Sequence, residues 1–131
     1  MAKLTRIAPE LPVSNLEESI AYYEQRLGFR EAMRMPSGDY AIVERDDIAI
    51  HLFADHARSS SPVSIHIFTE DLDTLHAELL ERGAHVSQGI VRKPWGNRDF
   101  RVHDDSGNEI KFTEPVSPDE QVPGARAILN P

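Results

Sequence analysis

The order of apolar and polar residues predicts a strand, a helix and three more strands in the first half of the chain. Apolar residues alternate from Ile7, which is the two-residue period of a strand that buries one face, and we expect this strand to span Leu4–Val13. Apolar positions at helical spacing follow, with Asn15 as the N-cap and Gly28 as a left-handed C-terminal residue. Three short strands are expected next, at Phe29–Met35, Asp39–Arg45 and Ile48–Phe53.

The second half of the chain repeats this order of elements. A strand is predicted at Val63–Thr69, then a helix that Asp71 caps and Gly83 ends, then strands at His85–Arg92, Arg98–His103 and Glu109–Thr113. A turn glycine recurs at a matching place, since Gly38 and Gly96 are 96 − 38 = 58 residues apart. The pattern therefore predicts one α+β domain over residues 1–131, built from two tandem βαβββ modules at about 4–54 and 63–114 with a Pro-rich tail at 115–131.

The two prolines of the first strand restrict its place in a sheet. Pro9 and Pro12 have no N–H group to donate to a neighbouring strand. The first strand should therefore lie at a sheet edge.

Composition narrows the classes of function. The chain has 131 residues, no cysteine and a formal net charge of −8, so a metal site would have to use His, Asp or Glu. The acidic balance disfavours nucleic acid and favours a cationic or neutral small ligand, although surplus acid also serves solubility alone. Apolar runs are too short for a membrane span, so a cytoplasmic protein is expected.

Two segments carry a resemblance to a known superfamily. Leu11–Tyr23 leads to Leu27–Phe29, and Trp95–Phe100 leads to the Asp104–Asn108 turn. Over about residues 4–114 the chain resembles the glyoxalase, bleomycin-resistance and extradiol-dioxygenase proteins, also called vicinal oxygen chelate proteins, and the second segment looks more like the bleomycin-resistance branch. The resemblance implies a curved, cup-shaped mixed sheet with the helices on its outer face. It also implies a homodimer that exchanges its first strand, with ligand grooves at or near the subunit interface.

The resemblance also bears on metal binding. Enzymes of the superfamily bind one divalent metal through strands one and four of each module, and these positions fall on Ala8, His51, Ser64 and Lys111. Only His51 is a competent neutral ligand, and a lysine ammonium would repel the metal. A slip of one residue would bring in His66 or Glu109 but would turn the apolar face outward. No metal and no other cofactor is therefore expected.

The predicted ligand site follows from strand alternation, which places a set of aromatic, histidine and charged side chains on the cup face. Plain core packing explains any single aromatic residue, but the whole set on one face favours binding by stacking and cation–π contact. Arg98 either contacts the ligand or pairs with a carboxylate to order the loop after Trp95. With Arg98 included, the predicted ligand residues are His51, Phe53, His66, Phe68, Trp95, Arg98, Glu109 and Lys111.

Three functional hypotheses remain open from the sequence. The leading one is a metal-independent binding protein of the bleomycin-resistance type, which sequesters a bulky cationic or planar ligand such as a glycopeptide antibiotic and has no catalytic residue. The alternative is a lyase, isomerase or dioxygenase of the same superfamily that acts on a small oxygenated substrate, with His51 or His66 as a base. The third is a partner domain without a small ligand, whose cup is filled by its own side chains or by Pro115–Pro131.

Overall fold

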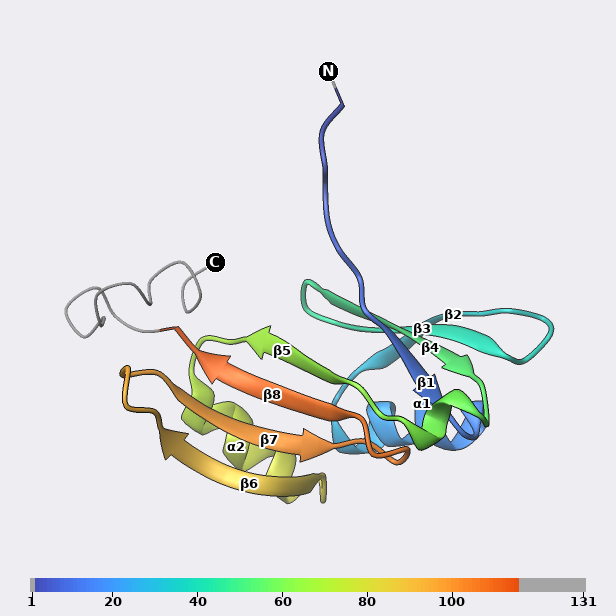
Figure 1. Cartoon of the computed structure of the whole chain (residues 1–131). Helices are drawn as coiled ribbons and strands as arrows, with labels where there is room; N and C mark the ends of the chain where they lie inside the picture. The colour runs from blue at the N-terminus through green and yellow to red at the C-terminus, as the bar shows by residue number, and fades with distance from the viewer. Residues whose placement is uncertain (1, 116–131) are drawn as a thin grey trace. The chain divides into compact units, whose positions relative to one another are not determined.

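The structure, a computed structural model, describes residues 2–115 of the chain (Figure 1). The first βαβββ module runs through β1 (Glu10–Val13), α1 (Leu16–Arg26), β2 (Arg30–Arg34), β3 (Tyr40–Arg45) and β4 (Ile48–Ala54), and a short 3-10 helix, η1 (Arg58–Ser60), follows it. The second module runs through β5 (Ser64–Phe68), α2 (Leu72–Glu81), β6 (His85–Arg92), β7 (Arg98–His103) and β8 (Glu109–Glu114). The predicted order of elements is confirmed.

Each module forms its own four-stranded mixed sheet with the same topology. The strand orders are β1-β4-β3-β2 and β5-β8-β7-β6, and the first strand of each module pairs in parallel with the fourth. The remaining pairs are antiparallel. The predicted α+β tandem fold is confirmed, and so is the position of the first strand at a sheet edge. The cup that both modules would build together stays a prediction.

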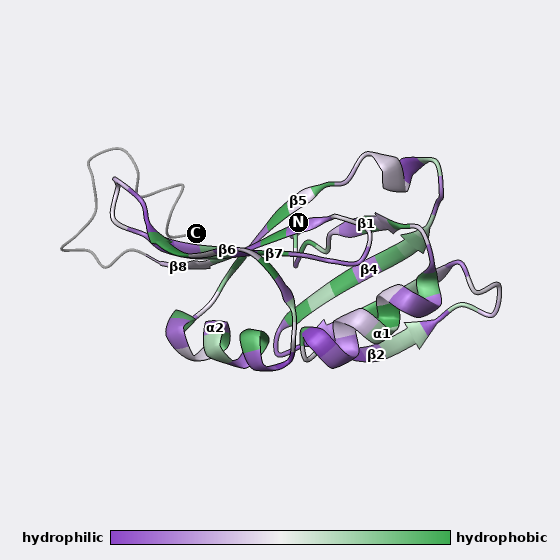
Figure 2. Cartoon of the chain, turned by 90° about the horizontal axis from the view of Figure 1, so that it is seen from below, coloured by the Kyte–Doolittle hydropathy of each residue, from purple (hydrophilic) through white to green (hydrophobic). Residues whose placement is uncertain are grey.

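Two compact units divide the described chain. One contains the residues up to Val63 together with Asp105–Asn108, and the other contains Ser64–Asp104 and the residues from Glu109 on. In the first unit α1 buries Leu16, Ile20 and Tyr23, and strand β4 is mostly hydrophobic (green in Figure 2). Burial of these apolar side chains is the main favourable contribution to the stability of the unit.

The second unit has an aromatic core between its sheet and α2. The rings of Phe100 and Phe112 stack at a centroid distance of 5.2 Å, and Leu72 and Leu79 of α2 are fully buried. His76 of α2 packs edge-on against Phe100 at 4.9 Å, so this histidine belongs to the packed layer. The sheet side that faces away from α2 is left for polar side chains.

The first strand is shorter than predicted. Regular pairing begins at Glu10, although the N–H of His51 still donates to the carbonyl of Pro9 at 3.0 Å. Ahead of it, Leu4 and Ile7 are 99% and 94% exposed, on the extended segment at the N-terminal end of Figure 1. The prediction of a strand from Leu4 was wrong because, within the described residues, these alternating apolar side chains pack against no other part of the chain.

The two helix starts differ. At α1 the backbone N–H of Glu18 donates to Oδ1 of Asn15 at 3.1 Å, which confirms the predicted cap. At α2 the N-cap residue is Asp71, but its φ of 53° is left-handed and its side chain makes no capping bond. A capping side chain normally acts from an extended backbone, so the predicted role of the Asp71 carboxylate was wrong.

The Asp104–Asn108 turn is anchored in the first unit. The fully buried Asn108 accepts a hydrogen bond from the N–H of Val63 at 3.0 Å and donates one to the carbonyl of Pro12 at 2.8 Å. The hydroxyl of Ser19 donates to Asp105 at 2.8 Å. The two Asn108 bonds pair the buried carbonyl of Pro12 in β1 and the part-buried N–H of Val63. The motif that carried much of the sequence resemblance is therefore structural in this protein.

Within residues 2–115, the structure has no helix that is both long enough and apolar enough to cross a lipid bilayer.

Candidate functional site

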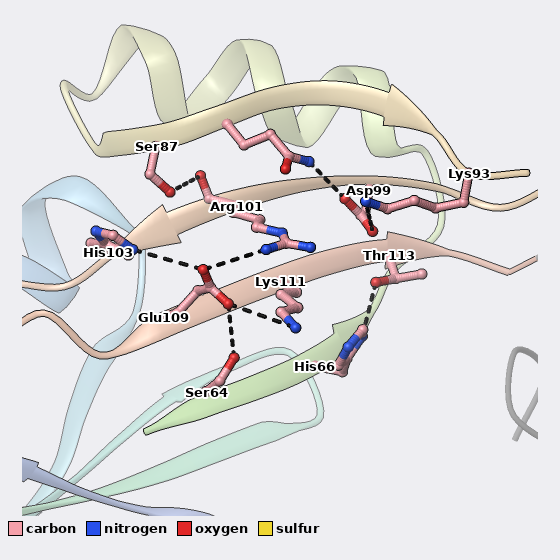
Figure 3. Close-up of polar contacts among 11 residues, drawn as sticks. Ser64, His66, Ser87, Lys93, Asp99, Arg101, His103, Glu109, Lys111 and Thr113 are labelled. Carbon is pink, nitrogen blue, oxygen red and sulfur yellow. Dashed lines mark hydrogen bonds and ion pairs between the residues drawn. The ribbon is translucent and has the colours of Figure 1, made fainter. Parts of the chain in front are cut away.

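Polar side chains gather on the sheet side of the second unit that faces away from α2 (Figure 3). They come from β5, β7 and β8. Lys111 of β8 lies between two cross-strand partners, His66 of β5 and Arg101 of β7. Alternation along the strands places the buried Phe100 and Phe112 on the opposite side, against α2. We call this set the charged face, and its members are Ser64, His66, Asp99, Arg101, His103, Glu109, Lys111 and Thr113.

Glu109 lies at the centre of the charged face. Its carboxylate accepts a hydrogen bond from the hydroxyl of Ser64 at 2.9 Å. Nη1 of Arg101 and Nζ of Lys111 both lie 3.7 Å from Glu109 oxygens, and Nε2 of His103 lies at 3.8 Å. Burial acts to raise the pKa of Glu109, but the Ser64 hydrogen bond and the nearby cations outweigh it and leave the pKa below its usual value. The carboxylate is therefore ionised at neutral pH.

His66 joins the charged face to an aromatic side chain. Its ring stacks on Phe68 with an interplanar angle of 26°, and its Nδ1 lies 3.2 Å from Oγ1 of Thr113. Partial burial, and then the charge of Lys111, lower the pKa of His66 below its usual value. The imidazole is therefore mainly neutral at pH 7 and offers one donor and one acceptor nitrogen.

The remaining carboxylate of the charged face, Asp99, is compensated. Its side chain is buried and accepts a hydrogen bond from Gln88 at 3.0 Å. The ammonium of Lys93 lies 3.9 Å from the other Asp99 oxygen. Asp99 therefore has its own cation and its own donor.

A second polar group, the Tyr40 cluster, lies in the first unit and consists of Glu10, Tyr40 and His51. The phenol of Tyr40 donates to Oε2 of Glu10 at 2.7 Å, and Nδ1 of His51 lies 2.6 Å from the phenol oxygen. The bond to Glu10, followed by burial, raises the pKa of Tyr40 to about 12. The phenol therefore keeps its single proton at neutral pH.

This bonding assigns the tautomer of His51. Because the phenol proton goes to Glu10, Nδ1 of His51 must carry the proton that joins it to Tyr40. In the neutral imidazole Nε2 then holds the lone pair, and this nitrogen is buried with no hydrogen-bond partner among the described residues. The cluster thus has one unused acceptor.

Phe53 in the first unit already has a cationic neighbour. The guanidinium of Arg58 lies over its ring, 4.9 Å from the centroid. The chain itself therefore supplies a cation–π contact on one side of a ring that the sequence assigned to a ligand.

Arg98 lies on the opposite side of the sheet from the charged face. The guanidinium of Arg98 binds Glu114 at 2.8 Å and Asp73 of α2 at 2.9 Å, on the helix side of the sheet. This arrangement fits the structural alternative for Arg98, which orders chain segments by pairing with carboxylates. Trp95 lies in the β6–β7 loop and is 41% exposed.

The predicted ligand residues are divided between the two units. His66, Phe68, Glu109 and Lys111 share one face of the second unit, whereas His51 and Phe53 belong to the first unit. Sequence reasoning missed Tyr40 and Arg101 as members of these groups. Strand register is the signal that identifies them, because Tyr40 lies opposite Phe53 and Arg101 lies opposite Lys111.

A divalent metal does not fit the charged face. Lys111 brings an ammonium group to it, and the hydroxyl of Ser64 is already bonded to Glu109. Over the described part of the chain, no three His, Cys, Asp or Glu side chains form a group that could hold a metal ion. Such a site needs about three or four converging N or O donors.

Comparison with known proteins identifies the family. The model of the Glyoxalase/Bleomycin resistance protein/Dioxygenase superfamily matches residues 3–112. The chain belongs to this superfamily. The tandem βαβββ modules described above are the shared architecture, and that architecture alone does not select one activity among those that the superfamily name contains.

Named relatives within the superfamily are bleomycin resistance proteins. Those of Geobacillus stearothermophilus and Staphylococcus aureus are 28% identical over 127 residues, covering 82% of this chain and 95% of each relative. Among solved structures, the bleomycin-binding protein of Streptomyces verticillus, complexed with copper(II)-bleomycin, is similar with a TM-score of 0.75 and 24% identity, over 87% of this chain and 98% of that one. A bleomycin resistance determinant encoded on the transposon Tn5 gives a TM-score of 0.73 and 22% identity, over 85% and 98% of the two chains.

Proposed function

We propose that this protein binds and sequesters a small molecule without a metal, as a member of the bleomycin-resistance type within its superfamily. The observation that carries the proposal is Lys111, whose ammonium group lies on the charged face. The resemblance to the superfamily implies a metal ligand at this position in the metal-dependent enzymes. The similarity to bleomycin resistance proteins over 82% of the chain supports the same conclusion. Binding in stoichiometric amounts lowers the free concentration of a toxic compound, and no chemical step is needed.

The ligand surface that we propose combines flat and polar groups. Phe68 and His66 form a stacked pair that suits a planar ring, and the exposed Trp95 indole offers a further stacking surface. Glu109 and Lys111 supply the hydrogen-bonding and charged contacts that orient a ligand on such a surface.

We also propose a homodimer in a cytoplasmic setting. The residues ahead of β1 extend from the first unit and expose Leu4 and Ile7 almost completely. A second copy of the chain can cover these side chains if the two copies exchange their first strands.

An enzyme of the same superfamily is the second candidate, and the Tyr40 cluster favours it. The hydrogen bonds from His51 to Tyr40 and from Tyr40 to Glu10 leave Nε2 of His51 as a lone-pair acceptor, which is the state that a general base needs. The same nitrogen is buried, so it serves as a base only if a substrate displaces what covers it. The His51→Ala variant should abolish turnover if this candidate is right and leave sequestration largely intact if it is not.

Calorimetric titration of metal-free bleomycin into the protein tests the proposed function. We expect binding that saturates at one or two drug molecules per dimer. Trp95→Ala should weaken it, whereas Val91→Ala should not, and the two side chains are matched because each is 41% exposed. Absence of binding, together with stoichiometric metal in the protein as isolated, would overturn the proposal in favour of the enzyme.

A further inference from the structure

Together with Lys93, which pairs with Asp99, the charged face holds more positive than negative charge, although the whole chain has a net charge of −8. Asp99 is 3% exposed and is compensated by Lys93 and Gln88. This leaves Arg101 and Lys111 opposite the single carboxylate of Glu109, an excess of 2 − 1 = 1 positive charge. Local charge on this face is therefore opposite in sign to that of the protein.

The two cations are also incompletely bonded. Both lie 3.7 Å from Glu109, which is beyond the usual range of a hydrogen bond, and the Glu109 carboxylate accepts its short bond from Ser64. Among the residues described, Nε of Arg101 is buried and has no hydrogen-bond partner. A buried donor without an acceptor costs free energy, and an anionic acceptor would recover it.

Arg101 and Lys111 lie close enough together for one ligand group to contact both. Arg101 and Lys111 are direct cross-strand partners on β7 and β8, so their side chains leave the same side of the sheet next to each other. Their side chains are 29% and 23% exposed, so both are screened only in part by water. The neighbouring strand adds His66 beside Lys111, with Phe68 stacked on it.

We propose that the charged face binds an anionic oxygen group, such as a carboxylate or a phosphate ester, on a ligand that also carries a planar ring. The anion lies between the Lys111 ammonium and the Arg101 guanidinium, and the ring packs against the His66–Phe68 pair. This inference rests on the proposed function and narrows it, because the expected cationic ligand would meet an excess of positive charge here.

The test uses three probes with the same ring and different charge: benzoate, neutral benzamide and cationic benzamidine. Each is titrated into the full-length 15N-labelled protein, and backbone amide shifts are followed by NMR. We expect benzoate to shift the amides around Arg101 and Lys111 in β7 and β8, benzamide to shift them less, and benzamidine to leave them unchanged. Equal shifts with benzamidine would overturn the proposal.

Matched variants assign the effect to the proposed cation. Lys111→Gln should weaken benzoate binding about tenfold, because it removes a hydrogen bond to a charged group. Lys111→Arg should retain binding. Arg30→Gln is the control, since it removes the same charge from an exposed ion pair with Glu44 in the first unit. Benzoate affinity that is unchanged in Lys111→Gln, or reduced equally in Arg30→Gln, would contradict the proposal.

Metal-free bleomycin, titrated in parallel, separates this inference from the proposed function. Bleomycin binding without a benzoate response would overturn the anion site and leave sequestration standing. A benzoate response without bleomycin binding would support the anion site and remove bleomycin as a representative ligand.

Discussion

The two modules share a topology but present different chemistry on their sheets. In the first module, Tyr40, Glu10 and His51 form a short hydrogen-bonded chain beside the aromatic ring of Phe53. The second module instead carries the charged face, where one carboxylate, Glu109, lies near the two cations Arg101 and Lys111 at longer distances. Repetition of a fold therefore does not repeat a site. Function has to be argued for each face from its own residues.

The turns between the third and fourth strands of the modules differ in the same way. In the first module this turn is Asp46–Asp47, which is exposed and short. In the second module the turn includes Asn108, which is fully buried against Pro12 and Val63. One turn only reverses the chain, and the other stabilises the start of the first unit.

The largest expected effect on stability tests the difference between these two turns. Asn108→Ala should lower the free energy of unfolding by about 2–4 kcal/mol, because it removes the hydrogen-bond partner of the buried Pro12 carbonyl and of the part-buried Val63 N–H. Asp47→Ala, in the corresponding turn, should change it by no more than about 0.5 kcal/mol. Urea unfolding of both variants measures the difference. Similar losses in the two variants would contradict the distinct role of the second turn.

The next effect separates the two sides of the second sheet. Arg98→Gln should cost about 1–2 kcal/mol of stability, since its guanidinium binds Glu114 and Asp73 in a partly buried position. Bleomycin affinity should stay at the wild-type value if Arg98 is structural. Thermal unfolding and calorimetric titration of the same sample measure the stability and the affinity. A loss of affinity without a loss of stability would indicate that Arg98 contacts the ligand.

Alkaline titration tests the hydrogen bond between Tyr40 and Glu10, which distinguishes the first module from the second. The folded-state pKa of Tyr40 is raised to about 12, so the stability that its proton provides is complete below the unfolded value of about 10 and is lost as the pH rises through about 12. Ultraviolet absorbance of tyrosinate should show one step near 12 that disappears in Tyr40→Phe. Ionisation of Tyr40 near its ordinary pKa would show that the bond to Glu10 is absent.

The smallest effect is an acid response of the charged face. The pKa of Glu109 is lowered, so its contribution to stability is present above the unfolded pKa of about 4.5 and is lost as the pH falls further. The pKa of His66 is also lowered, so stability declines as the pH falls below about 6.5, where the unfolded chain takes up the proton first. The free energy of unfolding, measured from pH 7 to pH 4, should depend less steeply on pH in each variant. Glu109→Gln should reduce the slope below about pH 4.5, and His66→Gln should reduce it below about pH 6.5. Unchanged slopes would contradict the assignment.

Much of the fold was predictable because it depends on local pattern. The helix at Leu16–Arg26 and the strands at His85–Arg92 and Arg98–His103 follow from periodicity and from residues such as Asn15 and Gly28. The first strand was overestimated because alternation at Ile7 does not reveal whether a partner surface exists. The left-handed backbone of Asp71 also has no signal in residue type alone.

The site was less predictable because it depends on register between distant strands. Alternation placed His66 and Lys111 on one face, which the pairing of β5 with β8 matches. Arg101 joins them only through the pairing of β7 with β8, and Tyr40 meets Glu10 only through two further strand pairs. These contacts need the fold before they can be recognised.

One paired titration tests whether this protein binds its ligand without a metal. Metal-free bleomycin is titrated by calorimetry into the protein as isolated and into the same protein after treatment with a chelator, with elemental analysis of both samples. Metal-independent binding predicts equal affinity and stoichiometry in the two samples. Binding that is lost after chelation and restored by adding a divalent metal would contradict it.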